Sequence, residues 1–264
     1  PGPPVELPIL RYHSVSHCSP ETALPGSVAM SILEEQLTSL VEDGWRLMGV
    51  TDALRTIADE GASRIVALTF DDGLLDFLNA FEVLGRLAAR ATLYVPTDTV
   101  GERVSRWDRG HSRLGWEALG QLSAAGVEIG SKAVHNRVLD VLPEGVMCSE
   151  VVGSKRLLED RLARTITSFC YPGGVTSARV RRVVHDAGYT SACLLEHTGA
   201  GRRHDLLGLR RIRVRSRITP ELLRALVNGS ATSRFATYVA RTAPAWRMVC
   251  RPTRRAIHIA IPRR

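Results

Sequence analysis

The feature that most constrains the fold is an alternation of apolar, β-type runs with segments of helical periodicity. Residues 65–70 (IVALTF) form an uninterrupted apolar run typical of a buried strand. Residues 74–89 then repeat large apolar side chains every three residues, close to one helix face. At least six such β-then-α units follow one another, which predicts a parallel sheet covered by helices, either a barrel or an open sheet.

The same patterns predict where the individual elements lie. We expect strands at residues 7–12, 65–70, 91–95, 127–130, 166–171, 190–194 and 211–214, and helices at 31–43, 74–89, 115–125, 143–163, 177–187 and from 219 onward. Because ligands gather beyond the carboxyl ends of parallel strands, polar residues at those ends are the candidates for a functional site.

Charge is distributed unevenly along the chain. The formal net charge is +8, but residues 202–264 contain 16 arginines, no lysine and two acidic residues, so the first 201 residues are net acidic. We therefore expect a globular domain at residues 1–230 and an Arg-rich C-terminal extension at 231–264. Nucleic-acid-binding motifs are missing, which argues against a nucleic-acid partner.

Arginines interleaved with Trp246 and other apolar residues in the extension suit peripheral contact with an anionic membrane. The alternative is a helix that packs on the domain with its arginines in water. The five cysteines are scattered without a CxxC pair, and no signal-peptide pattern or long apolar run occurs. We expect a cytoplasmic protein, peripheral at the inner membrane face.

Three strand ends carry chemically unusual residues. Asp71 and Asp72 follow an apolar strand, and such a pair can place a general base beside a metal ligand, although an ordinary polar turn would look similar. Lys132 and His135 follow the strand at 127–130. A rigid Tyr171-Pro172-Gly173 turn follows the strand at 166–171. In addition to these three, we expect His13, at the end of the first strand, to face the same mouth.

Together these segments resemble the polysaccharide deacetylases (NodB homology, carbohydrate esterase family 4) over about residues 6–228. The resemblance rests on YHSVS at 12–16, LTFDDG at 68–73, ATLYV at 91–95, EIGS at 128–131, LLEDRL at 157–162 and FCYPGG at 169–174. It implies a distorted (β/α) barrel that removes acetyl groups from an N-acetylated carbohydrate or glycoconjugate. It also implies a zinc-like divalent metal.

Carried over by position, the resemblance makes Asp71 the general base and Asp72 a metal ligand. The rigid turn at Tyr171, Pro172 and Gly173 could bring backbone donors near a ligand, so we expect it to bind substrate, together with His13 at the same mouth. The second motif departs from the family, because Lys132 and Asn136 stand where two metal-binding histidines are expected. His135 lies one position away and could serve as a ligand after a one-residue slip.

Cys170 likewise stands where many members carry an arginine, although others carry alanine. Three hypotheses follow from these departures. The protein is a deacetylase with a remodelled metal site of Asp72 and His135. Or it is a metal-free hydrolase in which Lys132 supplies the positive charge, since an ammonium has no lone pair for a metal. Or it is a non-catalytic glycan-binding protein of the same fold.

Overall fold

The computed structural model describes residues 7–17, 27–61, 63–102, 112–194 and 205–229. Eight parallel strands in these ranges form one curled sheet in the order β10-β1-β5-β6-β7-β8-β9, with β4 beside the first part of β5. The strands are β1 (Ile9–Tyr12), β4 (Arg46–Met48), β5 (Ile65–Asp71), β6 (Thr92–Val95), β7 (Glu128–Ser131), β8 (Ser168–Cys170), β9 (Ser191–Cys193) and β10 (Ile212–Arg213). The short strands β2 (Ser14–Ser16) and β3 (Ser27–Ala29) pair separately.

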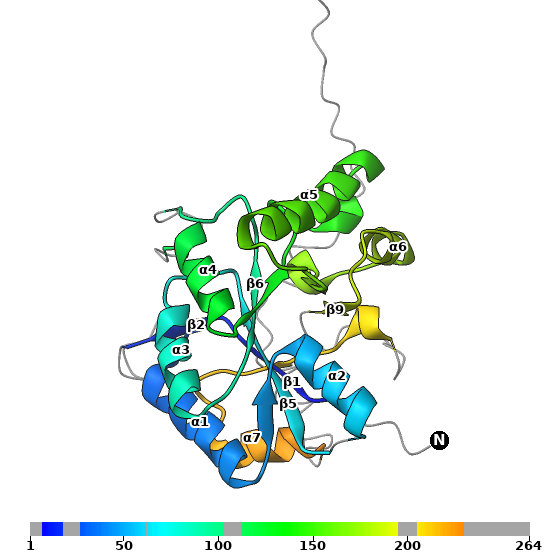
Figure 1. Cartoon of the computed structure of the whole chain (residues 1–264). Helices are drawn as coiled ribbons and strands as arrows, with labels where there is room; N and C mark the ends of the chain where they lie inside the picture. Colours follow the sequence, from blue (N-terminus) through cyan, green and yellow to red (C-terminus); the bar gives the residue numbers. More distant parts are fainter. Residues whose placement is uncertain (1–6, 18–26, 62, 103–111, 195–204, 230–264) are drawn as a thin grey trace, which may run out of the picture.

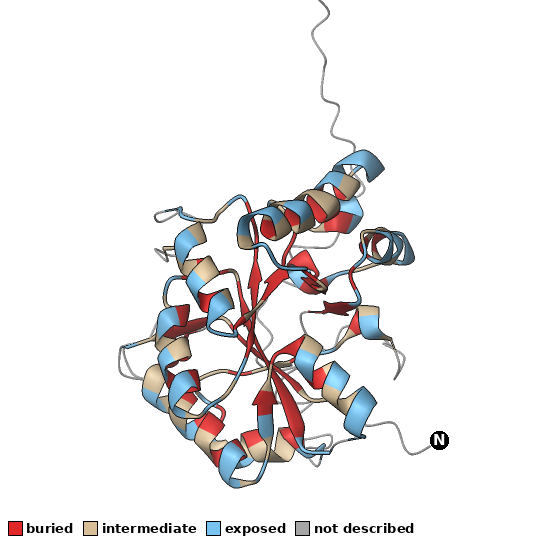
Figure 2. Cartoon of the chain, viewed as in Figure 1, coloured by how far each residue is buried: buried red, intermediate tan, exposed pale blue. Residues whose placement is uncertain are grey.

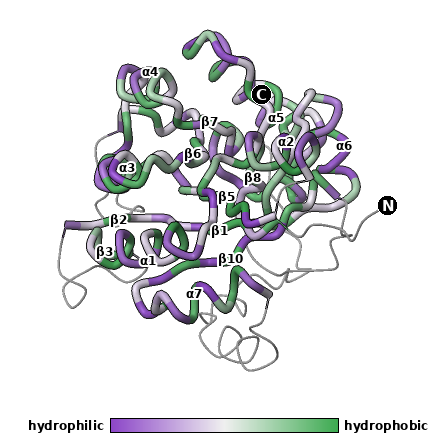
Figure 3. Tube along the Cα trace, turned by 60° about the horizontal axis from the view of Figure 1, so that its bottom comes forward, coloured by the Kyte–Doolittle hydropathy of each residue, from purple (hydrophilic) through white to green (hydrophobic). Residues whose placement is uncertain are grey.

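Helices surround this sheet, as Figures 1 and 3 show from two directions. They are α1 (Met30–Glu42), α2 (Val50–Glu60), α3 (Phe77–Arg86), α4 (Trp116–Ala124), α5 (Glu144–Leu162), α6 (Ala178–Asp186) and α7 (Pro220–Val227). Short 3₁₀ turns are η1 (Leu139–Val141), η2 (Pro172–Gly174) and η3 (Leu206–Gly208). Among the described residues, no helix is both long and apolar enough to cross a membrane.

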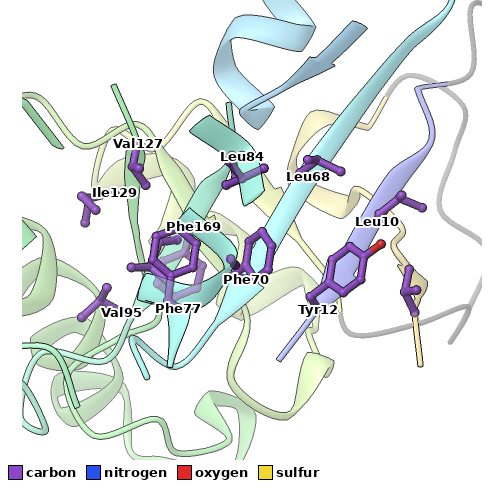
Figure 4. Packing of buried hydrophobic residues seen from close by; sticks show 14 of the residues in the cluster. Leu10, Tyr12, Leu68, Phe70, Phe77, Leu84, Val95, Val127, Ile129 and Phe169 are labelled. Carbon is purple, nitrogen blue, oxygen red and sulfur yellow. The ribbon is translucent and has the colours of Figure 1, made fainter. Parts of the chain in front are cut away.

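The strands bury both of their faces. Figure 2 shows buried residues along the central strands. Side chains on the outer face, among them Leu68 and Phe70, pack with Phe77 of α3 in the large core between sheet and helices (Figure 4). Alternate residues of the strands form a smaller inner cluster together with two residues of α2, Val50 and Ala53. The strand residues are Ile9, Ile65, Ala67, Tyr94, Cys170 and Cys193. Because successive strand residues point to opposite faces, this alternation sorts the sequence into outer core and barrel interior.

A single extended segment links the two edges of the sheet. Leu209 pairs with β9 through hydrogen bonds to Ala192 and Leu194, and three residues later Ile212 pairs with Leu10 of β1. Arg211 lies between these two pairings, and its side chain is fully buried. The segment therefore brings a guanidinium from the end of the domain into the barrel interior.

Every strand and helix expected from the sequence is present, with shifts of a few residues at the ends. The patterns missed α2 and the short strands β2, β3 and β4, each strand having only three residues. The C-terminal extension at 231–264, with its expected membrane contact, lies outside the described residues.

Candidate active site

The two adjacent aspartates reach the same mouth by different routes. Asp71 is the last residue of β5 and lies on the inner face of that strand, like Thr69. By strand alternation Asp72 would point outward like Phe70, but its backbone is left-handed (φ +75°), a conformation that aspartate tolerates better than most residues. Arg113 donates to the main-chain oxygen of Asp72. The turn therefore delivers both carboxylates to the carboxyl end of β5.

Asp71 belongs to an inner layer that comprises Asp71, Arg11 and Arg211. Arg11 donates through Nε to Asp71 Oδ2 at 2.6 Å, and Arg211 donates through Nη1 to Oδ1 at 2.7 Å and through Nη2 to Oδ2 at 3.2 Å. The side chain of Asp71 has no solvent exposure. Such charge-assisted contacts are the strong class of hydrogen bond, so this layer is held firmly.

The charges of the inner layer fix its ionisation. Burial alone would raise the pKa of Asp71, but Arg211, Lys132 and Arg11 outweigh burial and hold that pKa well below its usual value. In the same way Asp71 outweighs the effect of burial on Arg211, whose pKa is raised well above the ordinary range. Asp71 is therefore a stable carboxylate across the neutral pH range and a weak proton acceptor.

Asp72 belongs to an outer layer that comprises Asp72, His13 and Asn136. Its Oδ2 lies 2.9 Å from His13 Nε2, and its Oδ1 accepts from Asn136 Nδ2 at 3.2 Å. The side chain of Asp72 is 13% exposed and that of His13 is 38% exposed, so this layer meets solvent. Burial would raise the pKa of Asp72, but Lys132 and the His13 contact lower it strongly.

Lys132 joins the two layers. Its Nζ lies 2.5 Å from Asp72 Oδ1 and 3.5 Å from Asp71 Oδ2, and its side chain is only 5% exposed. Burial would lower the pKa of Lys132, but the two carboxylates outweigh burial and raise it. The ammonium therefore stays charged between them.

The turn after β7 sets the position of Lys132. The main-chain N–H of Lys132 donates to Val95 at the end of β6, and the next residue, Ala133, has a left-handed backbone. Glu150 of α5 accepts from the main-chain N–H groups of Val134 and His135 at 3.1 and 2.8 Å. These contacts hold the turn so that Lys132 and Asn136 face Asp72.

The remaining expected site residues lie apart from this charged cluster. His135 Nδ1 lies 2.6 Å from Glu150 Oε1, so the structure brings His135 to α5 and not to Asp72. The ring of Tyr171 is buried and its hydroxyl donates to the main-chain oxygen of Leu207. Pro172 is buried and Gly173 is exposed with φ +66°. Substrate binding by this turn stays a prediction. For Tyr171 the prediction concerns main-chain atoms only, because its side chain is buried.

Sequence reasoning missed Arg11 and Arg211. Arg211 directly precedes β10, and its Nη2 lies 3.1 Å from the Sγ of Cys170, the residue that the family resemblance matches with an arginine of many members. The guanidinium also lies over the ring of Tyr94, 5.5 Å from its centroid. The only signal in the sequence was a charged residue within an otherwise apolar strand pattern, at Arg11.

The side chains around Asp72 do not fit a divalent metal ion. An ammonium and an amide nitrogen both donate to Oδ1 of this carboxylate, and neither group has a lone pair available for a metal in that role. Within the described ranges no three His, Cys, Asp or Glu side chains are grouped so that they could hold a metal. Lys132 supplies positive charge at the carboxylate to which the family resemblance assigns the metal.

The matching family model decides the classification. The model for polysaccharide deacetylases matches residues 58–192, just over half of the chain. The chain belongs to the polysaccharide deacetylase family. The Bacillus subtilis (strain 168) protein YxkH is 25% identical over 214 residues, which cover 80% of this chain and 72% of YxkH.

Solved structures agree with this classification. The Streptococcus pyogenes deacetylase PplD, solved in complex with acetate, is 26% identical with a TM-score of 0.74, and the match covers 84% of this chain and 98% of PplD. BC0361, a polysaccharide deacetylase from Bacillus cereus, shares the fold at 21% identity with a TM-score of 0.71, over 84% of this chain and 69% of BC0361. These similarities confirm the distorted (β/α) barrel of the NodB type. Family membership implies a hydrolase fold and a carbohydrate substrate.

Proposed function

We propose that this polysaccharide deacetylase homologue hydrolyses the acetamido group of an N-acetylated carbohydrate without a metal ion. The observation that carries the proposal is the buried ammonium of Lys132, held 2.5 Å from Asp72 and 3.5 Å from Asp71. A fixed positive charge in a water-poor site can stabilise the oxyanion that forms when water attacks an amide carbonyl. The carbonyl oxygen of the acetamido group would then lie on the open side of Lys132.

Two groups at the mouth are candidates for the general base. The family resemblance favours Asp71, but this carboxylate is fully buried and its lowered pKa makes it a weak base. His13 is partly exposed, and Asp72 can accept a hydrogen bond from its Nε2–H, a tautomer in which Nδ1 carries the lone pair that can take a proton from water. We therefore favour His13 as the base, with Asp72 orienting its ring.

Release of acetate from a chitooligosaccharide tests the Lys132 proposal. We expect the wild-type rate to be unchanged by a metal chelator and to fall about 10²- to 10³-fold in Lys132→Met, because one electrostatic donor to the oxyanion is lost. Lys155→Met is a matched control, since Lys155 is the only other lysine of the chain and pairs with Glu159 on α5. A chelator-sensitive wild type, or an unchanged rate in Lys132→Met, would refute the metal-free mechanism.

The identity of the base is tested by the rate of acetate release from His13→Gln. With His13 as base, this variant should lower the rate about 10²-fold or more. If Asp71 is the base, His13→Gln should leave most of the rate intact. Circular dichroism of each variant separates loss of chemistry from loss of folding.

A second function, glycan binding without turnover, is favoured by one specific observation. Every carboxylate oxygen of Asp71 and Asp72 already accepts from a protein donor. Such a carboxylate already has hydrogen-bond donors from the protein and does not need a water molecule or a substrate to supply them. Binding of the same oligosaccharide with no acetate release from concentrated wild-type protein would favour this function over hydrolysis.

Peripheral contact of the Arg-rich extension with an anionic membrane remains a separate proposal, and so does a cytoplasmic location at the inner membrane face. Both rest on the arginine content of residues 231–264. Co-sedimentation of the full chain and of a chain ending at residue 230 with phosphatidylserine vesicles tests the contact. Equal pelleting of the two proteins would exclude it.

A further inference from the structure

Arg11 is the cation of the inner layer that is only partly used. It lies on the inner face of β1, two residues after Ile9 of the inner cluster, and its side chain is 9% exposed. The contact to Asp71 uses Nε alone. Neither terminal nitrogen of Arg11 donates a hydrogen bond to any residue that the structure describes.

Arg211 shows what a fully used guanidinium looks like in the same interior. It donates to the main-chain oxygen of Leu194, to Thr69, to both oxygens of Asp71 and to Cys170. A guanidinium has five N–H donors, and buried donors without partners are costly. The terminal nitrogens of Arg11 are not among the buried unpaired atoms of the described residues, so they open onto solvent-accessible space.

The charge of the cluster points in the same direction. Three cations, Arg11, Arg211 and Lys132, contact the carboxylates of only Asp71 and Asp72. One positive charge is therefore in excess in a largely buried cluster, where unbalanced charge is unfavourable. A bound monoanion would neutralise it.

We propose that the free edge of Arg11 is an anion subsite that binds a carboxylate of the substrate, so that the preferred ligand is an acidic N-acetylated sugar such as an N-acetylated hexuronic acid. The guanidinium edge offers two parallel N–H donors, which match the two oxygens of a carboxylate. A carboxylate carries the single negative charge that the cluster lacks, whereas a phosphate monoester carries about −1.5 to −2 at neutral pH. The inference rests on the proposed function only in taking this mouth as the sugar-binding site.

Calorimetric titration with a matched pair of sugars tests the subsite directly. The pair is N-acetylglucosamine and 2-acetamido-2-deoxyglucuronic acid, which differ only in a hydroxymethyl group against a carboxylate. We expect the wild type to bind the acid about tenfold or more tightly than the neutral sugar, in line with a charge-assisted bidentate contact. In Arg11→Met the two affinities should become equal.

Two further variants and two further ligands make the test decisive. Arg11→Lys keeps the positive charge but lacks the two parallel N–H donors of a guanidinium, so it should retain only part of the preference for the acidic sugar. This variant also keeps the test possible if Arg11→Met does not fold. Arg55→Met, on the exposed face of α2 where Arg55 pairs with Asp52, should keep the full preference. Acetate alone should bind far more weakly than the acidic sugar. N-acetylglucosamine 6-phosphate should bind no more tightly than the acidic sugar.

The proposal is overturned by equal wild-type affinities, by a preference that survives in Arg11→Met, or by stronger binding of acetate or of the phosphate. Because binding is measured and not turnover, the two proposals fail separately. An Arg11-dependent preference in a protein that releases no acetate supports the subsite and refutes hydrolysis. Acetate release without any preference for the acidic sugar refutes the subsite alone.

Discussion

Asp71 and Asp72 are neighbours in sequence, yet they lie in two layers of the mouth with opposite properties. In the inner layer, Asp71 and Arg211 are fully buried and only the outer edge of Arg11 reaches solvent, and the two guanidiniums hold the carboxylate. The outer layer around Asp72 is partly exposed and is held by an imidazole, an amide and the Lys132 ammonium. Asp71 is the last residue of β5 and Asp72 has a left-handed backbone, and this change of conformation directs the two carboxylates into different layers.

The difference shows how one charged cluster can combine rigidity with access. Charges that are buried and fully paired keep one ionisation state, because changing it would leave a partner charge uncompensated. Groups at the solvent edge can exchange protons and ligands at lower cost. Lys132 couples the layers. Asp71 of the inner layer helps to keep the Lys132 side chain protonated, and the resulting ammonium contacts Asp72 of the outer layer.

The largest expected contrast is in stability. Asp71→Asn leaves Arg11 and Arg211 without their counter-charge in the barrel interior, and we expect a loss of about 3–5 kcal/mol in the free energy of unfolding. Asp72→Asn should cost about 1 kcal/mol, because Lys132 keeps Asp71 as a counter-charge and the partly exposed His13 can turn toward water. Urea unfolding followed by circular dichroism measures both values.

A double variant separates the effect of the unpaired cation from the effect of losing the carboxylate. Arg211→Met in the Asp71→Asn background should cost less than the sum of the two single changes, because the second change removes a charge that the first left unpaired. Equal destabilisation by Asp71→Asn and Asp72→Asn would remove the distinction between the layers.

A second prediction converts the outer layer and leaves the inner layer intact. Lys132→His with Asn136→His places two imidazoles beside Asp72, and histidine tolerates the left-handed backbone of residue 136 (φ +52°). We expect the double variant to bind zinc at least about 10³-fold more tightly than the wild type, measured by competition with a chromophoric chelator. Lys155→His with Asn136→His is the control and should not gain zinc. No gain in the first variant would mean that the turn after β7 cannot present a metal site.

The sequence predicts the fold much better than it predicts the residues of the inner layer. Strand and helix periodicity located β5 and α3 because each has one repeating apolar pattern, and the motif around Asp71 located the mouth. Strands of three residues such as β4 are too short to show alternation, so the sequence patterns did not predict them.

Arg211 shows why the site was only partly predictable. It belongs to an arginine-rich segment that resembles a solvated surface, and only the pairing of this segment with both β9 and β1 turns its side chain inward. Lys132 was recognised by its position in a motif, but its contact with both aspartates depends on a left-handed turn. Long-range pairing and backbone conformation decided these roles, and neither follows from local pattern.

A third prediction concerns acid stability. The pKa of Asp71 is lower in the folded chain than in the unfolded chain, so this carboxylate contributes stability above the unfolded value of about 3.9 and loses it progressively as pH falls below that value. Each such group adds a slope of up to about 1.4 kcal/mol per pH unit. We expect Asp71→Asn to reduce the acid slope of the unfolding free energy by about one proton, measured by urea titrations from about pH 6 to 2.5. An unchanged slope would mean that Asp71 is not paired as described.

A smaller effect than that of Asp71→Asn is expected behind Lys132, at Glu150. Glu150→Gln keeps the size of the side chain but weakens its hold on the N–H groups of Val134 and His135, which should cost about 1–2 kcal/mol of stability. The Lys132 ammonium should also shift relative to the two aspartates, and a ¹⁵N spectrum of lysine Nζ shows this directly because the chain has only two lysines. Glu159→Gln on the same helix should move the Lys155 signal alone, since these two residues form an ion pair. A Lys132 signal that stays in place in Glu150→Gln would mean that the aspartates alone position the ammonium, and the link between the layers would then be independent of the turn after β7.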